Sequence, residues 1–578
     1  MATKNNTDAE AAGLGIARRA VLKGSALLAG SLATACATGG GASADLAQTS
    51  PSKEEEGPSV RAGKDTAIVN TQSGKVAGFV RNGIFGFKGI PYGAPTGAEN
   101  RFLPPKPPIG WAGVRSSRQY GPVCPQDKGM GRFNDEEAFI FQWNDSVESE
   151  DCLRLNVWTP GPGNTAKRPV MVWLHGGAFA AGSGHDLPAF DGENLSRRGD
   201  VVVVTLNHRL NLLGYLDLSA HGDKYAASGN VGMLDIVAAL QWVRDNIEGF
   251  GGDPGRVMIF GQSGGGAKVT TLMGMPAAKG LFHSAAVMSG SFGMVNTTEN
   301  SHRLTDLFLK ELGLDDASVE QLHTLPYDTL RRAGDAVMQR ENAPFDGFVD
   351  IRKIRNNLSF APVVDGAVLP EWPFRKTAPE MSADVPMIIG TTQNEFVTGI
   401  NNPDAMSMTQ VELRERVERA YPGRTEAIIA AFQATAPQAK PFELWSRIAT
   451  GPIRAAAIRQ AAVKADLNRA PAYLYEFTWQ TPILDGRPMA FHCADIPFAF
   501  FNTDRCDTMS GGGAEARSLS GSIADAFINL ARSGDPNHAG IDDWPVYKSA
   551  TSSTMIFDQD VRVSLNGDEE ALATLGDL

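Results

Sequence analysis

Residues 256–268, RVMIFGQSGGGAK, join a short apolar run to a glycine-rich turn. The glycine spacing is close to that of a phosphate-binding loop, but Ala267 stands where the loop lysine is required, and the hydroxyl that would hold a metal is missing as well. The dinucleotide-binding pattern also fails, because Ser263 occupies the position of its second glycine. The turn therefore fits neither kind of nucleotide site.

The same turn does fit a nucleophile elbow, in which a serine lies on a sharp strand-to-helix turn. The strained backbone of such a serine requires small residues two positions before it and two positions after it. Gly261 and Gly265 meet this requirement around Ser263. With 62 glycines in the chain, however, the five-residue pattern also arises by chance, so other parts of a catalytic site must be found elsewhere.

Short apolar runs alternate with helical stretches along the chain. Five runs are apolar on both faces, as the strands of a parallel sheet covered by helices must be. Residues 232–247 have apolar side chains at helical spacing and predict a crossover helix. This alternation predicts an α/β fold with a central, mostly parallel, doubly wound sheet and helices on both faces. The predicted strands are residues 169–174, 201–206, 256–260, 284–289 and 385–390.

The composition excludes some functions. The chain has 578 residues, 42% of them hydrophobic, which is enough for a large buried core. Its formal net charge is -12, and it has no long run of Lys or Arg. Nucleic-acid binding needs a concentrated basic face, so no nucleic-acid partner is expected. The spacing of the cysteines matches no zinc pattern, and we expect no metal site.

A nucleophilic serine needs a neighbouring base, and that base must be held by an acid. In hydrolases with a nucleophile elbow, the order along the chain is serine, acid, histidine. Only His492 and His538 lie far enough beyond Ser263 to leave room for an acid. His538 lies in a Gly/Pro/Asp-rich stretch typical of a surface loop, whereas His492 lies among apolar residues. We therefore expect His492 to be the base.

The acid is best placed in a loop directly after a buried strand. Glu395 has this position, a few residues beyond the predicted strand 385–390. Asp365 also follows a short apolar run, but its Asp-Gly pair is typical of a turn. Glu395 is therefore the expected acid, with Asp365 as the alternative.

Acyl transfer also needs an oxyanion hole, because negative charge develops on the carbonyl oxygen and backbone N–H groups must already point at it. Residues 172–184, VWLHGGAFAAGSG, predict a strand that ends in a glycine turn. Such a turn leaves N–H groups free. We expect Gly177 and Ala178 to be donors, together with Gly264 directly after the serine.

With these pieces assembled, the chain resembles the type B carboxylesterase family, which includes the cholinesterases, from about residue 66 to residue 560. The resemblance implies an α/β-hydrolase fold and hydrolysis of small-molecule carboxylic esters without metal or organic cofactor. It implies the same triad and the same oxyanion donors. It further implies that Ser289 supports the acid, and that Cys124 and Cys152 form a disulfide. The blocks that carry it are residues 87–97 (FKGIPYGAPTG), 149–160 (SEDCLRLNVWTP), 175–184 (HGGAFAAGSG), 207–216 (NHRLNLLGYL) and 229–254.

Several residues depart from the family pattern. Gln262, before the nucleophile, and Asn394 stand where the family commonly has acids, and Asp495 stands where it commonly has Glu. None of these removes a reacting group, but Gln262 and Asn394 delete two charges near the site. Cys493 and Cys506 have no clear counterpart in the family.

The expected reaction is a two-step hydrolysis through an acyl-enzyme, with an activity plateau on the alkaline side because the base must be neutral. Three alternatives share the fold: a lipase, an amidase, and a binding or adhesion module without catalysis. Phe139, Phe141 and Trp143 are candidates for the substrate pocket, with ordinary core packing as the alternative. The sequence leaves the natural ester, the preferred chain length and the oligomeric state open.

The N-terminus predicts export. The pair Arg18 and Arg19 precedes a short apolar run that ends at Cys36, which is typical of a twin-arginine signal. Cleavage before Cys36 would leave a lipid anchor on that cysteine as the contact with the membrane, whereas cleavage after Ala44 would release a soluble protein. The expected location is the periplasm, the cell envelope through the lipid, or the medium. The expected parts are a signal over residues 1–44, a flexible linker over 45–64 and one catalytic domain over 65–578.

Overall fold

The structure is a computed structural model that describes residues 59–127, 135–144, 146–163, 165–291, 293–342 and 357–576. The expected signal, with Cys36 and both cleavage sites, lies outside the described residues, as does most of the expected linker. Val60 and Arg61, which the sequence analysis placed in the linker, form the short strand β1 at one edge of the main sheet.

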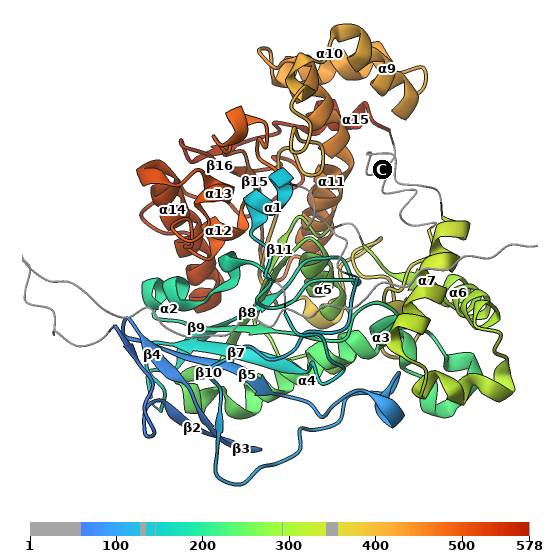
Figure 1. The fold of residues 1–578 in the computed structure, drawn as a ribbon. Helices are drawn as coiled ribbons and strands as arrows, with labels where there is room; N and C mark the ends of the chain where they lie inside the picture. Colours follow the sequence, from blue (N-terminus) through green and yellow to red (C-terminus); the bar gives the residue numbers. More distant parts are fainter. Residues whose placement is uncertain are drawn as a thin grey trace, which may run out of the picture. The chain divides into compact units, whose positions relative to one another are not determined.

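A central sheet of 12 strands organises the described residues (Figure 1). Its middle, from β9 through β16, is parallel, and both edges are antiparallel. All five predicted strands are confirmed as members of this parallel part. In spatial order the strands are β1 (Val60–Arg61), β4 (Phe79–Arg81), β5 (Ile84–Pro91), β7 (Arg154–Thr159), β9 (Val202–Leu206), β8 (Arg168–Leu174), β10 (Gly252–Gln262), β11 (Ser284–Met288), β14 (Met387–Thr392), β15 (Ala472–Phe477), β16 (Thr554–Phe557) and β17 (Arg562–Ser564).

Two small sheets accompany the main one. Their strands are β2 (Ile68–Thr71), β3 (Gly74–Ala77) and β6 (Val114–Ser116) in one, and β12 (Asn296–Thr297) and β13 (Val363–Val364) in the other. The described α-helices are α1 (Asp135–Phe141), α2 (Glu193–Gly199), α3 (Asn211–Tyr215), α4 (Val231–Asn246), α5 (Gly264–Leu272), α6 (Thr298–Glu311), α7 (Tyr327–Glu341), α9 (Gln410–Ala420), α10 (Thr425–Thr435), α11 (Pro441–Ala465), α12 (Ile496–Ala499), α13 (Asp507–Ser510), α14 (Gly513–Ser533) and α15 (Glu569–Ala573).

Strand β8 shows why helices cover both faces of the sheet. Successive side chains of a strand point to opposite faces, and in β8 both sets are apolar and buried from Pro169 to Leu174. Val172 packs into the same core as α4, α5 and α11, whereas Trp173 packs into a second core with α12 and α14. The predicted crossover helix is confirmed as α4. Among the described residues, no helix is both long enough and apolar enough to span a bilayer.

The parallel register brings the ends of four strands to one edge of the sheet. Gly261 of β10 pairs with Leu174 of β8, and Gln262 pairs with Met288 of β11. Strand β14 continues the same direction beside β11. Ligands of such sheets bind outside the carboxyl ends of the strands. We therefore expect a site in the loops that follow β8, β10, β11 and β14.

Candidate active site

Ser263 lies on the sharp turn between β10 and α5. Its backbone has φ 57° and ψ -125°, a conformation that is strained for any residue other than glycine. The glycines on either side are required by space: a Cβ on Gly261 would lie 2.6 Å from the carbonyl carbon of Gly265, and one on Gly265 would overlap the Leu174 carbonyl. The Ser263 N–H donates to the Met288 carbonyl at 2.8 Å. The sequence pattern therefore forms a true elbow, with the serine exposed to a cavity.

The turn after β8, residues 175–182, is called the oxyanion loop here. Gly177 and Ala178 have φ values of 78° and 53°, and neither N–H donates to a backbone carbonyl among the described residues. The N–H of Gly264 belongs to the first turn of α5, where helix amides have no intrahelical acceptor. A Cβ on Gly264 would overlap the backbone of Ala178, so the two segments meet closely. The three expected donors thus gather beside Ser263.

Glu395 and His492 form a pair in the loops after β14 and β15. Glu395 is buried, and its carboxylate binds Nδ1 of His492 through Oε2 and the N–H of Thr392 through Oε1, the latter at 3.1 Å. The N–H of His492 also donates to the Glu395 carbonyl at 2.7 Å. The carboxylate therefore fixes the imidazole with Nε2 left for another partner.

Gln262 occupies the space beside the imidazole. Its Nε2 lies 3.2 Å from Nε2 and 3.3 Å from Nδ1 of His492, and its Oε1 accepts a hydrogen bond from the Cys493 thiol at 3.1 Å. Among the hydrogen bonds of the described residues, none joins Ser263 to His492. Such catalytic contacts are often long in structures without substrate and tighten on binding. Gln262, which was expected beside the reacting groups from its place before the nucleophile, is therefore a direct contact of His492.

One cavity of about 570 Å³ brings most of these groups together, whereas the buried Glu395 is not part of its lining. Ser263, His492 and the loop glycines line it, together with apolar and aromatic side chains. Phe141 and Trp143 belong to this wall and stack on each other with ring centroids 4.8 Å apart. Phe139 does not line the cavity, because it points to solvent and is 52% exposed. The pocket prediction is therefore confirmed for two of the three aromatic residues and wrong for Phe139.

The two alternatives from the sequence lie elsewhere. His538 binds the Ser522 carbonyl at 2.9 Å, and Asp365 binds the N–H groups of its own turn and the amide of Asn230. Neither lines the cavity. Their contacts are those of a surface loop and a turn.

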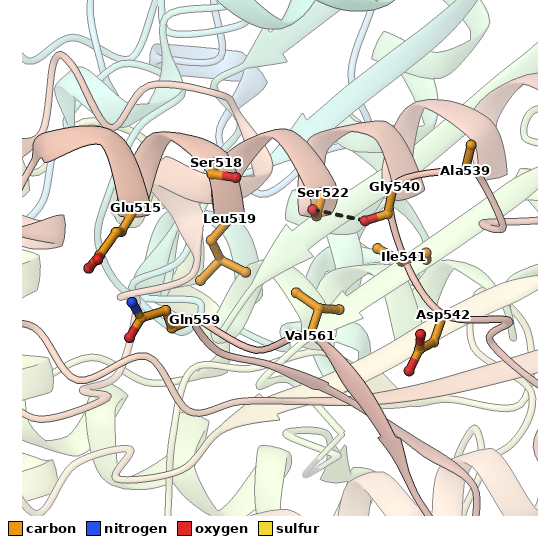
Figure 2. Close-up of a pocket in the computed structure, with 10 residues that line it drawn as sticks. All are labelled: Glu515, Ser518, Leu519, Ser522, Ala539, Gly540, Ile541, Asp542, Gln559 and Val561. Carbon is orange, nitrogen blue, oxygen red and sulfur yellow. Dashed lines mark hydrogen bonds between the residues drawn. The ribbon is translucent and has the colours of Figure 1, made fainter.

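A second hollow, of about 480 Å³, lies between α14 and the segments around residues 541 and 560 (Figure 2). It holds two carboxylates, Glu515 and Asp542. No imidazole or thiol is found among the described side chains that line it. It therefore lacks the pair of nucleophile and base that the first cavity contains. Among all described residues, no cluster of His, Cys, Asp and Glu could hold a metal ion.

Two further expectations concern buried residues near the site. Ser289 follows β11 with φ 50°, and its Oγ is buried without a hydrogen-bond partner among the described residues, so support of the acid by a hydrogen bond is not seen. The expected disulfide is also absent: Cys124 and Cys152 are free thiols in contact. That contact, together with burial, raises the pKa of Cys152 well above its usual value. The family resemblance therefore predicted the proximity of these two cysteines correctly, and the disulfide itself stays a prediction.

Gln126 and Lys268 hold the oxyanion loop, and the sequence analysis gave neither a role. Gln126 accepts a hydrogen bond from the Gly182 N–H at 2.7 Å and donates to the Gly182 carbonyl at 3.1 Å. Lys268 donates to the His175 carbonyl at 2.9 Å. A lysine in an otherwise small and apolar helix start is the only sequence signal for this contact.

Asp495 is a second buried carboxylate close to the Glu395–His492 pair. The Tyr475 hydroxyl donates to its Oδ2 at 2.7 Å, while its Oδ1 has no hydrogen-bond partner among the described residues. Burial raises the pKa of Asp495 to about 7; the Tyr475 hydrogen bond opposes this rise and the charge of Glu395 adds to it. Asp495 therefore titrates near neutral pH beside the Glu395–His492 pair.

Asp495→Asn is expected to stabilise the protein at pH 8 more than at pH 5. The folded-state pKa of about 7 lies above the ordinary value of 3.8, so the folded state binds more protons than the unfolded state between these limits. The free energy of unfolding therefore falls as pH rises through this window, and Asn, which cannot ionise, removes the fall. Thermal unfolding at both pH values measures the effect. The exposed Asp542→Asn is the control, and an equal Tm difference at both pH values for Asp495→Asn would contradict the expectation.

The fold and these side chains define a class. A serine at a nucleophile elbow, beside an imidazole–carboxylate pair at the carboxyl edge of a mostly parallel sheet, is the arrangement of an α/β hydrolase. The family model described as "Carboxylesterase family" matches residues 65–574, and the chain belongs to this family.

Similar proteins are esterases. The para-nitrobenzyl esterase of Bacillus subtilis (strain 168) is 34% identical over 518 residues, which cover 87% of this chain and 97% of that protein. A solved esterase of Clostridium hathewayi, described as able to hydrolyse aliphatic aromatic polyesters, has a TM-score of 0.76 at 37% identity, covering 89% of this chain and 98% of that one. A carboxylesterase of Geobacillus stearothermophilus has a TM-score of 0.73 at 33% identity, covering 88% and 100%. This protein is therefore a serine carboxylesterase.

Proposed function

We propose that Ser263, Glu395 and His492 form the catalytic triad of this esterase. The observation that carries the proposal is that Ser263, on its elbow, and His492 line one cavity, while the buried carboxylate of Glu395 holds the imidazole. His538 does not line that cavity, and the hydrogen bonds of Asp365 go to its own turn and to Asn230, not to His492. The other candidate functions of the fold lack such a supporting observation.

Each member of the proposed triad and each backbone donor has a role in the proposed ester hydrolysis. His492 takes the Ser263 proton through Nε2 as Oγ attacks the ester carbonyl, and the carbonyl electrons move to the oxygen. The N–H groups of Gly177, Ala178 and Gly264 stabilise that oxyanion. The imidazolium then gives its proton to the leaving alcohol, and an acyl-enzyme remains. Water, deprotonated by the same imidazole, attacks the acyl carbon. The imidazolium then returns that proton to Oγ of Ser263 as the C–Oγ bond breaks and the carboxylic acid leaves.

The cavity walls suggest which esters fit. Its lining is mostly apolar and includes five aromatic rings: Phe141, Trp143, Phe190, Phe396 and Phe491. Apart from His492, every ionisable oxygen or nitrogen side chain among the described residues of the lining is acidic: Asp127, Glu137 and Asp186. We therefore propose small neutral esters with aromatic or short aliphatic groups as the substrates, and discrimination against esters that carry a carboxylate.

The proposal is tested with p-nitrophenyl butyrate, its anionic counterpart mono-p-nitrophenyl succinate, and p-nitrophenyl palmitate. We expect a burst of about one p-nitrophenol per active site with the butyrate, because the acyl-enzyme accumulates. The succinate should show a kcat/KM at least about tenfold lower at low salt, and the difference should shrink at high salt. Absence of any burst or turnover would argue against the triad. Faster turnover of emulsified palmitate would identify a lipase instead.

A further inference from the structure

Lys268 is a buried lysine that the reaction steps above do not use. It lies in α5, one turn beyond the elbow, and its side chain is 0% exposed. Its Nζ donates to the His175 carbonyl at 2.9 Å and lies 3.5 Å from the Gly176 carbonyl oxygen. The ammonium therefore connects α5, the helix that follows the elbow, to the backbone of the oxyanion loop.

The groups around Lys268 provide little compensation for its charge. Burial lowers the pKa of Lys268 to about 7, with only the carboxylate of Asp186 acting in the opposite direction. His175 and His208 stack at 5.0 Å, and burial lowers the pKa of each well below its usual value, so both imidazoles are neutral. The Phe179 ring centroid lies 5.6 Å from Nζ. The strongest direct partners of the ammonium are thus the loop carbonyls.

Of these two carbonyls, that of Gly176 belongs to the peptide that supplies the expected Gly177 donor, and that of His175 belongs to the peptide directly before it. The Gly176 oxygen and the Gly177 N–H are the two ends of one planar trans peptide, and they point in opposite directions. The Gly176 oxygen accepts a hydrogen bond from Nδ1 of His175 at 2.9 Å. The ammonium of Lys268 lies farther from this oxygen, at 3.5 Å. A donor on the oxygen polarises the peptide and strengthens the N–H at its other end. Gly176 and Gly177 both line the cavity, so this N–H is available to the substrate.

We propose that Lys268 is a positioning residue for the oxyanion hole, which fixes and polarises the peptide that ends in the Gly177 N–H. This inference rests on the proposed function, because it gives Lys268 a purpose only if that N–H stabilises an oxyanion. Lys268 acts through the backbone and does not touch the substrate. Its effect is therefore concentrated in the transition state, where the oxygen carries its charge.

The experiment compares wild type with Lys268→Met, which keeps the length of the side chain, and Lys268→Gln, which keeps a donor. For p-nitrophenyl butyrate we expect kcat to fall at least about tenfold in Lys268→Met, with KM within about twofold, and a smaller fall in Lys268→Gln. The inhibition constant of a boronic acid that forms a tetrahedral adduct with serine should rise by a similar factor. Thr271→Ala is the matched control in the same helix, since the Thr271 hydroxyl donates to the Ala267 carbonyl within that helix and not to the oxyanion loop.

The pH dependence of kcat distinguishes the effect of the charge of Lys268 from the effect of its packing. The ratio of wild-type kcat to Lys268→Met kcat should be larger at pH 6 than at pH 9, because Lys268 loses its proton between these values. Equal kcat in folded variants, or a fall in kcat with unchanged boronate inhibition, would overturn the inference, and so would a ratio independent of pH. If wild type neither turns over the ester nor binds the boronate, the proposed function fails. If wild type does both and the variants equal it, only the role of Lys268 fails.

Discussion

Ser263→Ala is expected to lower kcat for p-nitrophenyl butyrate by about 10⁵-fold, with Tm within about 2 °C of wild type. In the proposed reaction Oγ is the attacking atom, and the cavity offers no second hydroxyl at an elbow among the described residues. The substitution keeps the Cβ and adds no atom to the tight contacts of Gly261 and Gly265. The remaining turnover should reflect the oxyanion donors acting on water alone. Steady-state kinetics and thermal unfolding measure the two effects.

Ser518→Ala is the control for this experiment. Ser518 lines the second hollow, which has no imidazole among its described side chains, so the same chemical change should leave kcat unchanged there (Figure 2). A Ser263→Ala protein with more than about one per cent of wild-type kcat would mean that another group attacks the ester. The triad would then have to be assigned again from the cavity residues.

The sequence predicted the parts of the fold whose physics is local. The predicted strands were recognisable because both of their faces are apolar, and α4 because its apolar residues recur at helical spacing. The elbow followed from the same kind of argument, since the positive φ of Ser263 leaves no room for side chains at Gly261 and Gly265. These features depend on neighbours in the chain, and therefore they could be derived from it.

Contacts between distant segments were beyond such arguments. The carbonyl contacts of Lys268 arise only when α5 meets the oxyanion loop, and the position of Gln262 beside His492 arises only when the end of β10 meets the loop after β15. Phe139 and Phe141 are two residues apart on one short helix, yet they differ in exposure because α1 shows only one face to the cavity. The resemblance brought Cys124 and Cys152 together, but the state of their sulfurs depends on redox chemistry and not on sequence.

Glu395→Gln is expected to lower kcat by about 10³–10⁴-fold while KM changes by less than about threefold. Gln has nearly the same shape, and its oxygen can still accept the Thr392 N–H, so the fold should persist. Its NH₂ group, however, would face Nδ1 of His492 and donate to it. The imidazole would then carry its proton on Nε2 and could not accept one from Ser263. The loss of the carboxylate charge would also leave the imidazolium unstabilised in the transition state.

The matched control for Glu395→Gln is Asp365→Asn, which makes the same change at the other acid that the sequence allowed. Asp365 holds its own turn and Asn230, so Asp365→Asn should lower Tm but leave kcat within about twofold of wild type. Measuring kcat and Tm for both variants separates catalysis from stability. A large fall in kcat for Asp365→Asn, with none for Glu395→Gln, would transfer the role of acid to Asp365. The buried contact between Glu395 and His492 would then be only structural.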